Sequence, residues 1–437
     1  MIKLTGNKDT LLKYIDTAKI GQILLIATVL IFTLKFFQST PFERIFFQVQ
    51  AVFLVVTVVF LVSYVVITVR RRDSINEIVL YFLILISVIP LYSMFRASTE
   101  FGQPFIYGVL SERSWLLAGI GIWFYYVITQ EKMALTAVES AFVFMAWASL
   151  VIFSLFVLFY TPDQIDFQSK FVRMSAERGL RFRFQMYFII FGALYYFVKF
   201  TLYRNLKYLV ILLLFLVYVL FVHQSRTCTV ALSLTFLLYI CFNYPLRRIP
   251  IILLKLSLFI LIALIVIHAL KPGYLDRTSH LFLQSFKVLT GELSEDPSAN
   301  SRIFQSKKVL SYFDTHPLSA WLGVGRISNR WNDGYRSLFG HFYPCDIGVL
   351  GGLFLYGIPG LVFIFIIPVV ITIKTVRRVS GKGNVFLKAL KYMLVFAIIR
   401  SIQGSFYFSP MVYVIPLFIL MAYKDLEVRS GADCFVA

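Results

Sequence analysis

The chain has 437 residues, of which 59% are hydrophobic and 17% are aromatic. Soluble globular domains are about 45–50% apolar, so this excess excludes an ordinary soluble protein and indicates a polytopic membrane protein. The formal net charge is +20, from 42 basic and 22 acidic residues. Because cytoplasmic loops of membrane proteins collect Lys and Arg, we assign most of this charge to topology and expect no nucleic-acid partner.

Apolar runs of about 20 residues, the length that crosses a bilayer, recur along the chain. A long polar stretch, 271–345, interrupts them. The chain is expected to be all-α, with helices one to nine in 1–270, a large loop in 271–345, and helices ten to twelve with a tail in 346–437. The twelve predicted spans are 20–37, 48–69, 77–95, 114–130, 136–160, 184–203, 208–224, 228–244, 250–270, 346–373, 385–402 and 407–423.

Basic residues mark one side of this arrangement. They occupy the N-terminal segment, every second short loop and the C-terminal tail, for example Lys13, Arg71, Lys132, Arg204, Arg247 and Arg378. The positive-inside rule makes this side cytoplasmic, so both termini are predicted to be inside. Segments 161–184 and 271–345 are then external, although both also carry basic residues.

The external segment 271–345 is expected to contain a helix, because "SRIFQSKKVLSYF" has amphipathic helical spacing. Either Asp296 or Ser298 would cap the start of this helix. The basic pair Lys307 and Lys308 has two explanations, a functional one and the general tolerance of long external loops for charge. The predicted apolar positions of the helix are Ile303, Val309, Leu310 and Phe313.

Motifs for several kinds of chemistry do not occur. The sequence has no phosphate-binding glycine loop, HExxH or GxSxG, and its cysteines and histidines lack metal-ligand spacing. Guanidinium groups bind phosphate bidentately, so arginines on the external face indicate an anion site that uses neither a metal nor another cofactor. At an outer leaflet, a lipid-linked phosphate or diphosphate fits such a site. The arginines are Arg181, Arg183, Arg226, Arg302 and Arg400.

Two of these arginines, and one acid, have structural alternatives. Arg400 could extend to the outer headgroups, and Arg226 could stabilise a tight turn. Asp346 stands where the polar segment meets the tenth span, in the right place to deprotonate an attacking hydroxyl. Asp346 could instead cap the helix and complement its dipole.

Several motifs between residues 180 and 361 resemble the bacterial O-antigen polymerase and O-antigen ligase superfamily. They are "SRT" at 225–227, "SR" at 301–302, "HPLSAWLGVG" at 316–325 and "DIGVLGGLFLYGIPGL" at 346–361. The ligase branch has a His eleven residues before the first of two glycines, which correspond here to Gly357 and Gly360. Asp346 occupies that position, and His341 lies five residues too early. This departure favours the polymerase branch, as does the spacing of Arg181 and Gly192.

The resemblance implies a GT-C-like glycosyltransferase of the bacterial inner membrane. It would join oligosaccharide repeat units carried on undecaprenyl diphosphate at the periplasmic face, without metal or other cofactor. Asp346 and Arg302 would be catalytic. A chain-length regulator and a flippase would be possible partners, besides membrane lipids. The diphosphate and the lipid-linked glycan would be bound by Arg181, Arg183, Arg226, Arg400 and His341.

Three alternatives stay open. An O-antigen ligase would transfer the glycan to lipid A core. A transporter of anionic glycolipid would carry charges deep in several spans and often shows internal repeats, whereas the charges here are predicted mainly at one face and no repeat is found. A peptidoglycan polymerase of similar architecture is the third alternative.

Overall fold

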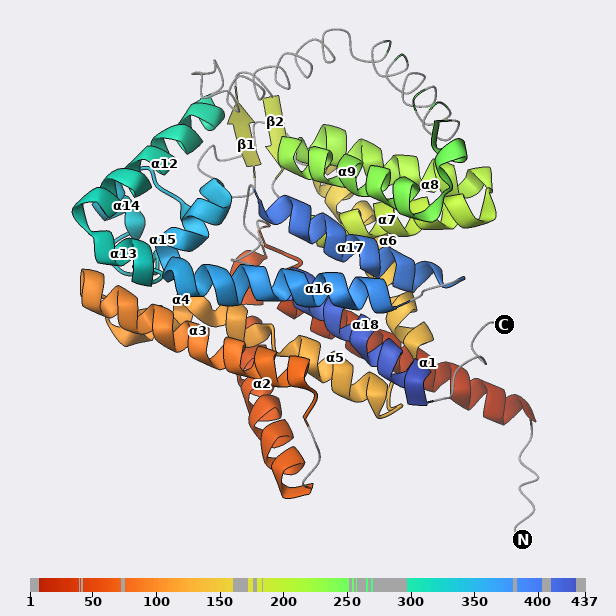
Figure 1. The fold of residues 1–437 in the computed structure, drawn as a ribbon. Coiled ribbons are helices and arrows are strands. Elements are labelled where there is room, and N and C mark those ends of the chain that lie inside the picture. Colours follow the sequence, from red (N-terminus) through yellow and green to blue (C-terminus); the bar gives the residue numbers. More distant parts are fainter. Residues whose placement is uncertain are drawn as a thin grey trace.

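The computed structural model is almost entirely helical (Figure 1). It describes residues 8–38, 40, 42–71, 75–159, 172–175, 179–182, 184–250, 254, 257, 265, 269, 297–379, 383–402 and 410–429. The all-α prediction needs one correction, an antiparallel hairpin of β1 (Val172–Ser175) and β2 (Gly179–Phe182). Alternating apolar residues at 172, 174, 180 and 182 are the sequence signal for these strands.

Most predicted spans correspond to helices, apart from 250–270, which lies mainly outside the described residues. Five helical segments of the described part are long and apolar enough to cross a membrane. The first eight spans and the last two are represented by α1 (Lys8–Thr33), α2 (Glu43–Arg71), α3 (Glu77–Phe101), α4 (Phe105–Leu117), α5 (Ile120–Thr129), α6 (Leu135–Phe159), α7 (Tyr187–Tyr203), α8 (Leu206–Val217) with the π-helix η2 (Tyr218–His223), α9 (Arg226–Asn243), α17 (Val385–Ser401) and α18 (Met411–Arg429).

The fourth predicted span is two helices, α4 and α5. Residues 118 and 119 form a turn between the two helices, although their backbone angles stay in the α region. At Gly119 the chain lies so close to α2 that a β-carbon would be 2.6 Å from Leu61 Cδ1. The tenth span is also interrupted, and consists of α15 (Gly348–Gly360), the π-helix η5 (Leu361–Ile366) and α16 (Ile367–Arg378).

Polar side chains fix where several helices begin. Asn76 and Asn205 accept hydrogen bonds from backbone N–H groups of α3 and α8, and Ser225 and Asn384 do the same for α9 and α17. Asn and Ser are favoured at these positions because they satisfy N–H groups that have no partner within the helix. The turns between spans are therefore defined by local sequence.

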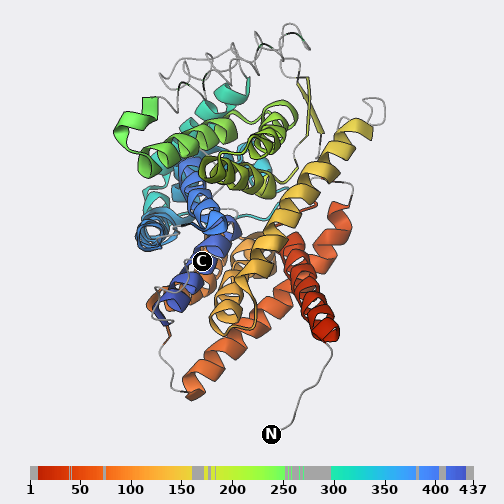
Figure 2. The same ribbon diagram turned by 90° about the vertical axis from the view of Figure 1, so that its right-hand side faces the viewer.

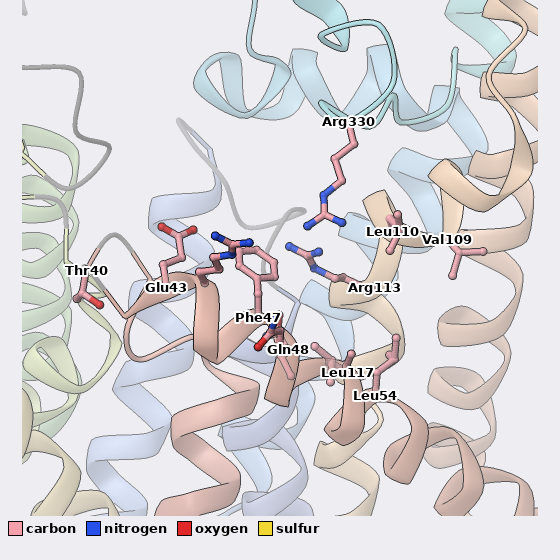
Figure 3. Close-up of a pocket in the computed structure, with 13 residues that line it drawn as sticks. Thr40, Glu43, Phe47, Gln48, Leu54, Val109, Leu110, Arg113, Leu117 and Arg330 are labelled. Atoms are coloured by element: carbon pink, nitrogen blue, oxygen red, sulfur yellow. The ribbon is translucent and has the colours of Figure 1, made fainter.

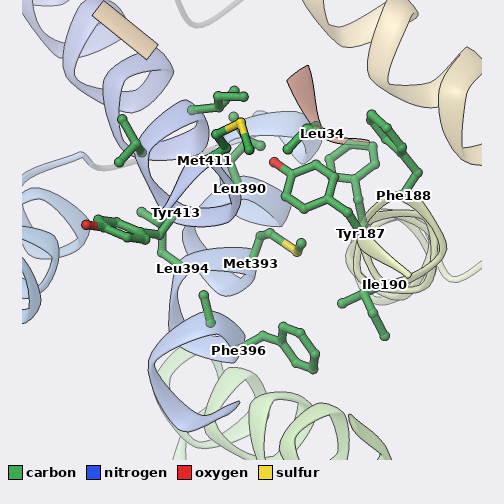
Figure 4. Packing of buried hydrophobic residues seen from close by; sticks show 14 of the residues in the cluster. Leu34, Tyr187, Phe188, Ile190, Leu390, Met393, Leu394, Phe396, Met411 and Tyr413 are labelled. Atoms are coloured by element: carbon green, nitrogen blue, oxygen red, sulfur yellow. The ribbon is translucent and has the colours of Figure 1, made fainter. Parts of the chain in front are cut away.

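The hydrophobic core lies where α7, α17 and α18 pack together. Tyr187, Phe188, Met393 and Met411 are buried there (Figure 4). Helix α18 also packs along α5, and α1 packs against α6 (Figure 2). Helix α2 differs, because only 6% of its most apolar window is buried (Figure 1). Its apolar surface is consistent with contact to lipid.

The two ends of the bundle differ in composition. At one end, Gln22 of α1 donates to the Lys132 carbonyl (3.4 Å), and Arg429 of α18 donates to the Thr129 carbonyl (3.2 Å). Helices α12 (Pro297–Thr315), α13 (Pro317–Leu322) and α14 (Tyr335–Phe339) lie away from that end (Figure 1). The assignment of the first end to the cytoplasm stays a prediction.

Helix α12 is the helix predicted within 271–345, with a different buried face. Val309 is buried as expected, but Leu310 is 53% exposed and Gln305 is buried. The polar Gln305 is accommodated because its amide oxygen accepts from the Tyr343 N–H (2.8 Å). Ser298 lies inside the helix and therefore does not cap it, whereas Asp296 lies outside the described residues.

The segment that follows α13 is joined to α15 through backbone hydrogen bonds. The Val324 and Gly325 N–H groups donate to the Phe354 and Leu355 carbonyls, both at 2.9 Å. The Leu355 carbonyl is free to accept because its helical partner would be residue 359, a proline without an N–H. The two long sequence motifs, 316–325 and 346–361, therefore meet at this kink in α15.

The kink depends on Gly357, and we expect Gly357→Ala to destabilise the protein. Its φ of 67° and ψ of −171° form a combination that is essentially restricted to glycine, and a β-carbon would lie 2.2 Å from the Trp321 carbonyl oxygen. The cost should be about 1–3 kcal/mol. The measurement is the thermal unfolding midpoint of purified protein. Gly21→Ala is the control, because nothing lies within 4 Å of the added carbon; equal midpoints for both variants would contradict the assignment.

Candidate functional site

Arg326 lies in the segment between α13 and α14, and hydrogen bonds to its backbone fix its position. The Arg326 N–H donates to Ser93 Oγ (2.9 Å), and its carbonyl accepts from Ser111 Oγ (3.1 Å) and Gln103 Nε2 (3.3 Å). These partners lie on α3, on α4 and in the turn between them. The guanidinium Nη1 lies 3.8 Å from Glu112 Oε2. Arg326 is thus fixed between two helices that come much earlier in the chain.

Glu112 is fully buried, and its carboxylate is shared by several partners. Ser93 Oγ donates to Oε1 (2.6 Å), and the Tyr356 hydroxyl lies 3.0 Å from the same oxygen. The network joins α3, α4, α15 and the segment of Arg326. Removing one partner of a buried ion pair leaves an uncompensated charge and is strongly destabilising. Glu112 therefore positions Arg326.

A cavity of about 750 Å³ lies between α2 and α4, close to Arg330 (Figure 3). Arg113 and Arg330 extend towards one another there, and the Arg113 guanidinium lies 4.1 Å from the centre of the Phe47 ring. Arg44 and Glu43 of α2 line the same cavity. The remaining wall is mainly apolar, with Ala51, Leu54, Val109, Leu110 and Leu117.

Lys35 adds to the positive charge near this cavity. It lies in the turn after α1, and its ammonium donates to Ser114 Oγ (3.0 Å). Burial, together with the charges of Arg113 and Arg326, lowers the pKa of Lys35 to about 7, while Glu43 opposes the shift. An anion bound nearby would stabilise the protonated lysine.

The structure changes the interpretation of Asp346. This exposed residue lies in the 3₁₀ turn η4 (Pro344–Ile347), and its N–H donates to the Tyr343 carbonyl (2.9 Å). Helix α15 begins after Ile347, with no side-chain cap, because Gly348 turns the chain at a φ of 56°. The helix-cap alternative for Asp346 is therefore wrong. Its role as a base stays a prediction.

Arg302 and Arg326 are each linked to the turn of Asp346 through a neighbouring residue. Arg302 precedes Gln305 by three residues, and such residues are neighbours on a helix face. Gln305 binds the Tyr343 N–H, so this face of α12 lies over η4. Arg326 interacts electrostatically with Cys345, the residue before Asp346.

Arg226 and Arg400 lie together elsewhere. Arg226 is the first residue of α9, but Ser225 caps that helix, with the Cys228 N–H 3.4 Å from Ser225 Oγ. The charge of Arg400, in the last turn of α17, acts on the same Cys228. The cap seen at this turn is thus the Ser225 side chain.

The remaining predicted site residues are Arg181, Arg183 and His341. Arg181 pairs with Arg173 in the hairpin register, and β2 packs against η2, the helix just before Arg226. Arg183 lies outside the described residues. His341 is exposed, with its ring centroid 5.2 Å from that of Tyr343. None of these positions tests the predicted binding roles.

Sequence reasoning missed Arg44, Arg113 and Arg326, as well as Glu112. Glu112 had only a weak signal, because it lies in the polar stretch "SERS" at the start of the fourth predicted span. The arginines had none, since nothing local distinguishes them from the many other basic residues of the chain.

Residues 210–365 match the family described as O-Antigen ligase. Over this stretch, which is less than half of the chain, the protein is similar to that family, and we call the stretch the family-matched domain. This domain runs from α8 into η5 and includes the kinked α15, Arg226, Arg302, Arg326 and Asp346. The match is consistent with the O-antigen polymerase and ligase superfamily. A comparison with curated proteins and one with solved structures gave no match.

The basic cavity is lined by the family-matched domain and by helices that precede it in the chain. Arg330 belongs to the domain, whereas Arg44 and Arg113 come from α2 and α4. Glu112 likewise reaches into the domain through Arg326 and Tyr356. The N-terminal helices therefore complete a site that the family-matched domain alone does not contain.

Lys35 should make anion binding at this site dependent on pH. A bound anion raises the pKa of Lys35 above 7, so binding takes up a proton and weakens as the pH rises through that value. We expect the affinity for pyrophosphate to fall by about 3- to 10-fold between pH 7 and 8.5. The measurement is calorimetric titration. In Lys35→Met, the affinity for pyrophosphate should depend less on pH than in the wild-type protein. Pyrophosphate itself titrates in the same way with both proteins, so the difference between the two pH profiles reports Lys35. Parallel profiles would show that Lys35 is not part of the site.

Proposed function

We propose that the protein is a surface-polysaccharide polymerase that joins oligosaccharide repeat units carried on undecaprenyl diphosphate. The observation that carries the proposal is Arg326, which the buried Glu112 holds beside the turn of Asp346. It supports the proposal because a buried carboxylate orients a cation near the turn that carries Asp346, and both Arg326 and Asp346 lie in the stretch that matches the O-antigen ligase family. Such a pair suits a reaction in which an anionic leaving group departs and a hydroxyl loses a proton.

The proposed reaction uses the arginines for the diphosphate and Asp346 for the proton. A hydroxyl of the acceptor sugar attacks the anomeric carbon of the donor sugar, and its proton passes to Asp346. The bond from that carbon to the diphosphate oxygen breaks, and undecaprenyl diphosphate leaves. Arg302 and Arg326, the arginines linked to the turn of Asp346, stabilise the charge that develops on the leaving group, and Arg226 contributes to binding of the donor diphosphate.

The other predicted residues have supporting roles in this proposal. Arg181 or Arg183 guides the lipid-linked acceptor, Arg400 adds positive charge beside Arg226, and His341 contacts the glycan. The reaction requires neither a nucleotide sugar nor a metal. A flippase would deliver the lipid-linked unit to the outer face.

The direct test uses purified protein and a synthetic undecaprenyl-diphosphate oligosaccharide in the presence of EDTA. We expect products that grow by whole repeat units, together with released undecaprenyl diphosphate. A protein without the substrate and a heat-treated protein with it provide the two blanks. Failure to extend the oligosaccharide under any metal condition would overturn the proposal.

The second candidate is the O-antigen ligase, which the description of the matched family favours. Complementation distinguishes the two functions. A polymerase restores long chains to a polymerase-deficient strain whose lipopolysaccharide carries single repeats. A ligase restores any O-antigen at all to a ligase-deficient strain, and rescue of that strain alone would assign the chain to the second function.

A further inference from the structure

The cavity between α2 and α4 has a cationic end and an apolar wall. Its cationic side chains are Arg44, Arg113 and Arg330, with Glu43 as the carboxylate among its lining residues. The lining therefore carries a net charge of two, and Lys35 and Arg326 add further charge because both interact with the residues that line it. Arg113 is held in place by the Phe47 ring, at 4.1 Å.

The apolar wall continues into surface that is suited to lipid. Ala51 and Leu54 of α2 line the cavity. On the same helix, Val52, Val55 and Val59 are each about 60% exposed, and the helix is apolar enough to cross a membrane while little of it is buried. A hydrocarbon chain could therefore lie against Ala51 and Leu54 and continue along the exposed valines of α2 into the bilayer, while Gln48 and Gln50 line the part of the cavity nearer the arginines.

We propose that this cavity binds the diphosphate head of a membrane lipid, with the lipid chain against α2 and α4. Arginine forks match phosphate oxygens, and three of them fit a head with two phosphates better than a singly charged phosphodiester. The site is separate from Arg302, Arg226 and Asp346. It rests on the proposed function in one respect, because the carrier of that reaction is a lipid of this class.

The position of Arg330 gives the site a consequence for the reaction. Arg330 lies on the same short segment as Arg326, and both act electrostatically on Arg113. A lipid diphosphate held at α2 and α4 would thus touch the segment that Glu112 fixes beside Asp346. The cavity is a binding site that a carrier lipid occupies when it enters from the membrane or leaves after transfer.

The test measures binding of undecaprenyl diphosphate, without any sugar, to purified full-length protein in detergent micelles. Arg113→Gln and Arg330→Gln should each weaken binding by about 10-fold or more, the usual order for a lost charge-assisted hydrogen bond. Arg336→Gln is the matched control, because Arg336 is exposed, pairs with Asp333 and lies outside the cavity. Ala51→Trp should weaken binding as well, by filling the apolar wall. Size-exclusion profiles establish that each variant is folded.

Competition identifies the ligand class. Inorganic pyrophosphate that competes as strongly as the lipid would overturn the role of the apolar wall, and phosphatidylglycerol that competes as strongly would overturn the preference for a diphosphate. Unchanged affinity in Arg113→Gln and Arg330→Gln would place the lipid elsewhere. These binding measurements do not require glycosyl transfer. If only the proposed enzymatic function is wrong, the protein will still bind the lipid but will make no polymer.

Discussion

Replacing Arg302 with alanine is expected to slow glycosyl transfer by about 10²–10³, the usual effect of removing one transition-state donor. Cells that depend on this variant should make lipopolysaccharide with single repeats at normal protein levels. Gel profiles of lipopolysaccharide, with immunoblots of the protein, provide the measurement. The reason for the size of the effect is the position of α12, whose face lies over the turn of Asp346 through the bond of Gln305 to Tyr343.

Lys307→Ala is the matched control for Arg302→Ala. Lys307 lies on the same helix and is exposed. It should leave the length distribution unchanged, which separates a specific guanidinium from the general positive charge of α12. Long chains in the Arg302→Ala strain would remove Arg302 from the reaction.

Much of the helical layout could be predicted because long apolar runs leave few alternatives. The break between α4 and α5 was not predicted; it lies where Gly119 packs closely against Leu61 of α2. The hairpin was missed because its short alternating pattern was treated only as a loop rich in arginine. Gly357 and Pro359 were local signals for the kink in α15, but only the structure shows that segment 323–325 pairs with it.

The sequence predicted an anion-binding site made of arginines, but it did not identify all of the arginines that form it. Net charge and topology indicated arginines at one face. Which arginines share a space depends on contacts between distant parts of the chain, such as Arg326 with Glu112. The sequence motifs marked the family-matched domain, whereas the cavity residues Arg44 and Arg113 belong to helices outside it.

Asp346→Asn is the prediction that distinguishes most sharply between a chemical and a structural role for this residue. Asparagine keeps the size of the side chain, and the bond from the residue 346 N–H to the Tyr343 carbonyl does not involve the side chain. Since Asp346 caps no helix, the substitution should leave stability unchanged. Loss of a general base typically costs about 10²–10⁴ in rate, and we expect a decrease of that order.

The assay for Asp346→Asn is single-turnover extension of the synthetic lipid-linked oligosaccharide, with lipid binding measured in parallel. A base acts in the chemical step, so the rate should fall while the affinity for undecaprenyl diphosphate stays the same. Asp333→Asn is the control, because Asp333 is an exposed carboxylate of the same polar segment and pairs with Arg336. If Asp346→Asn extends the oligosaccharide as fast as Asp333→Asn, another group must take the proton.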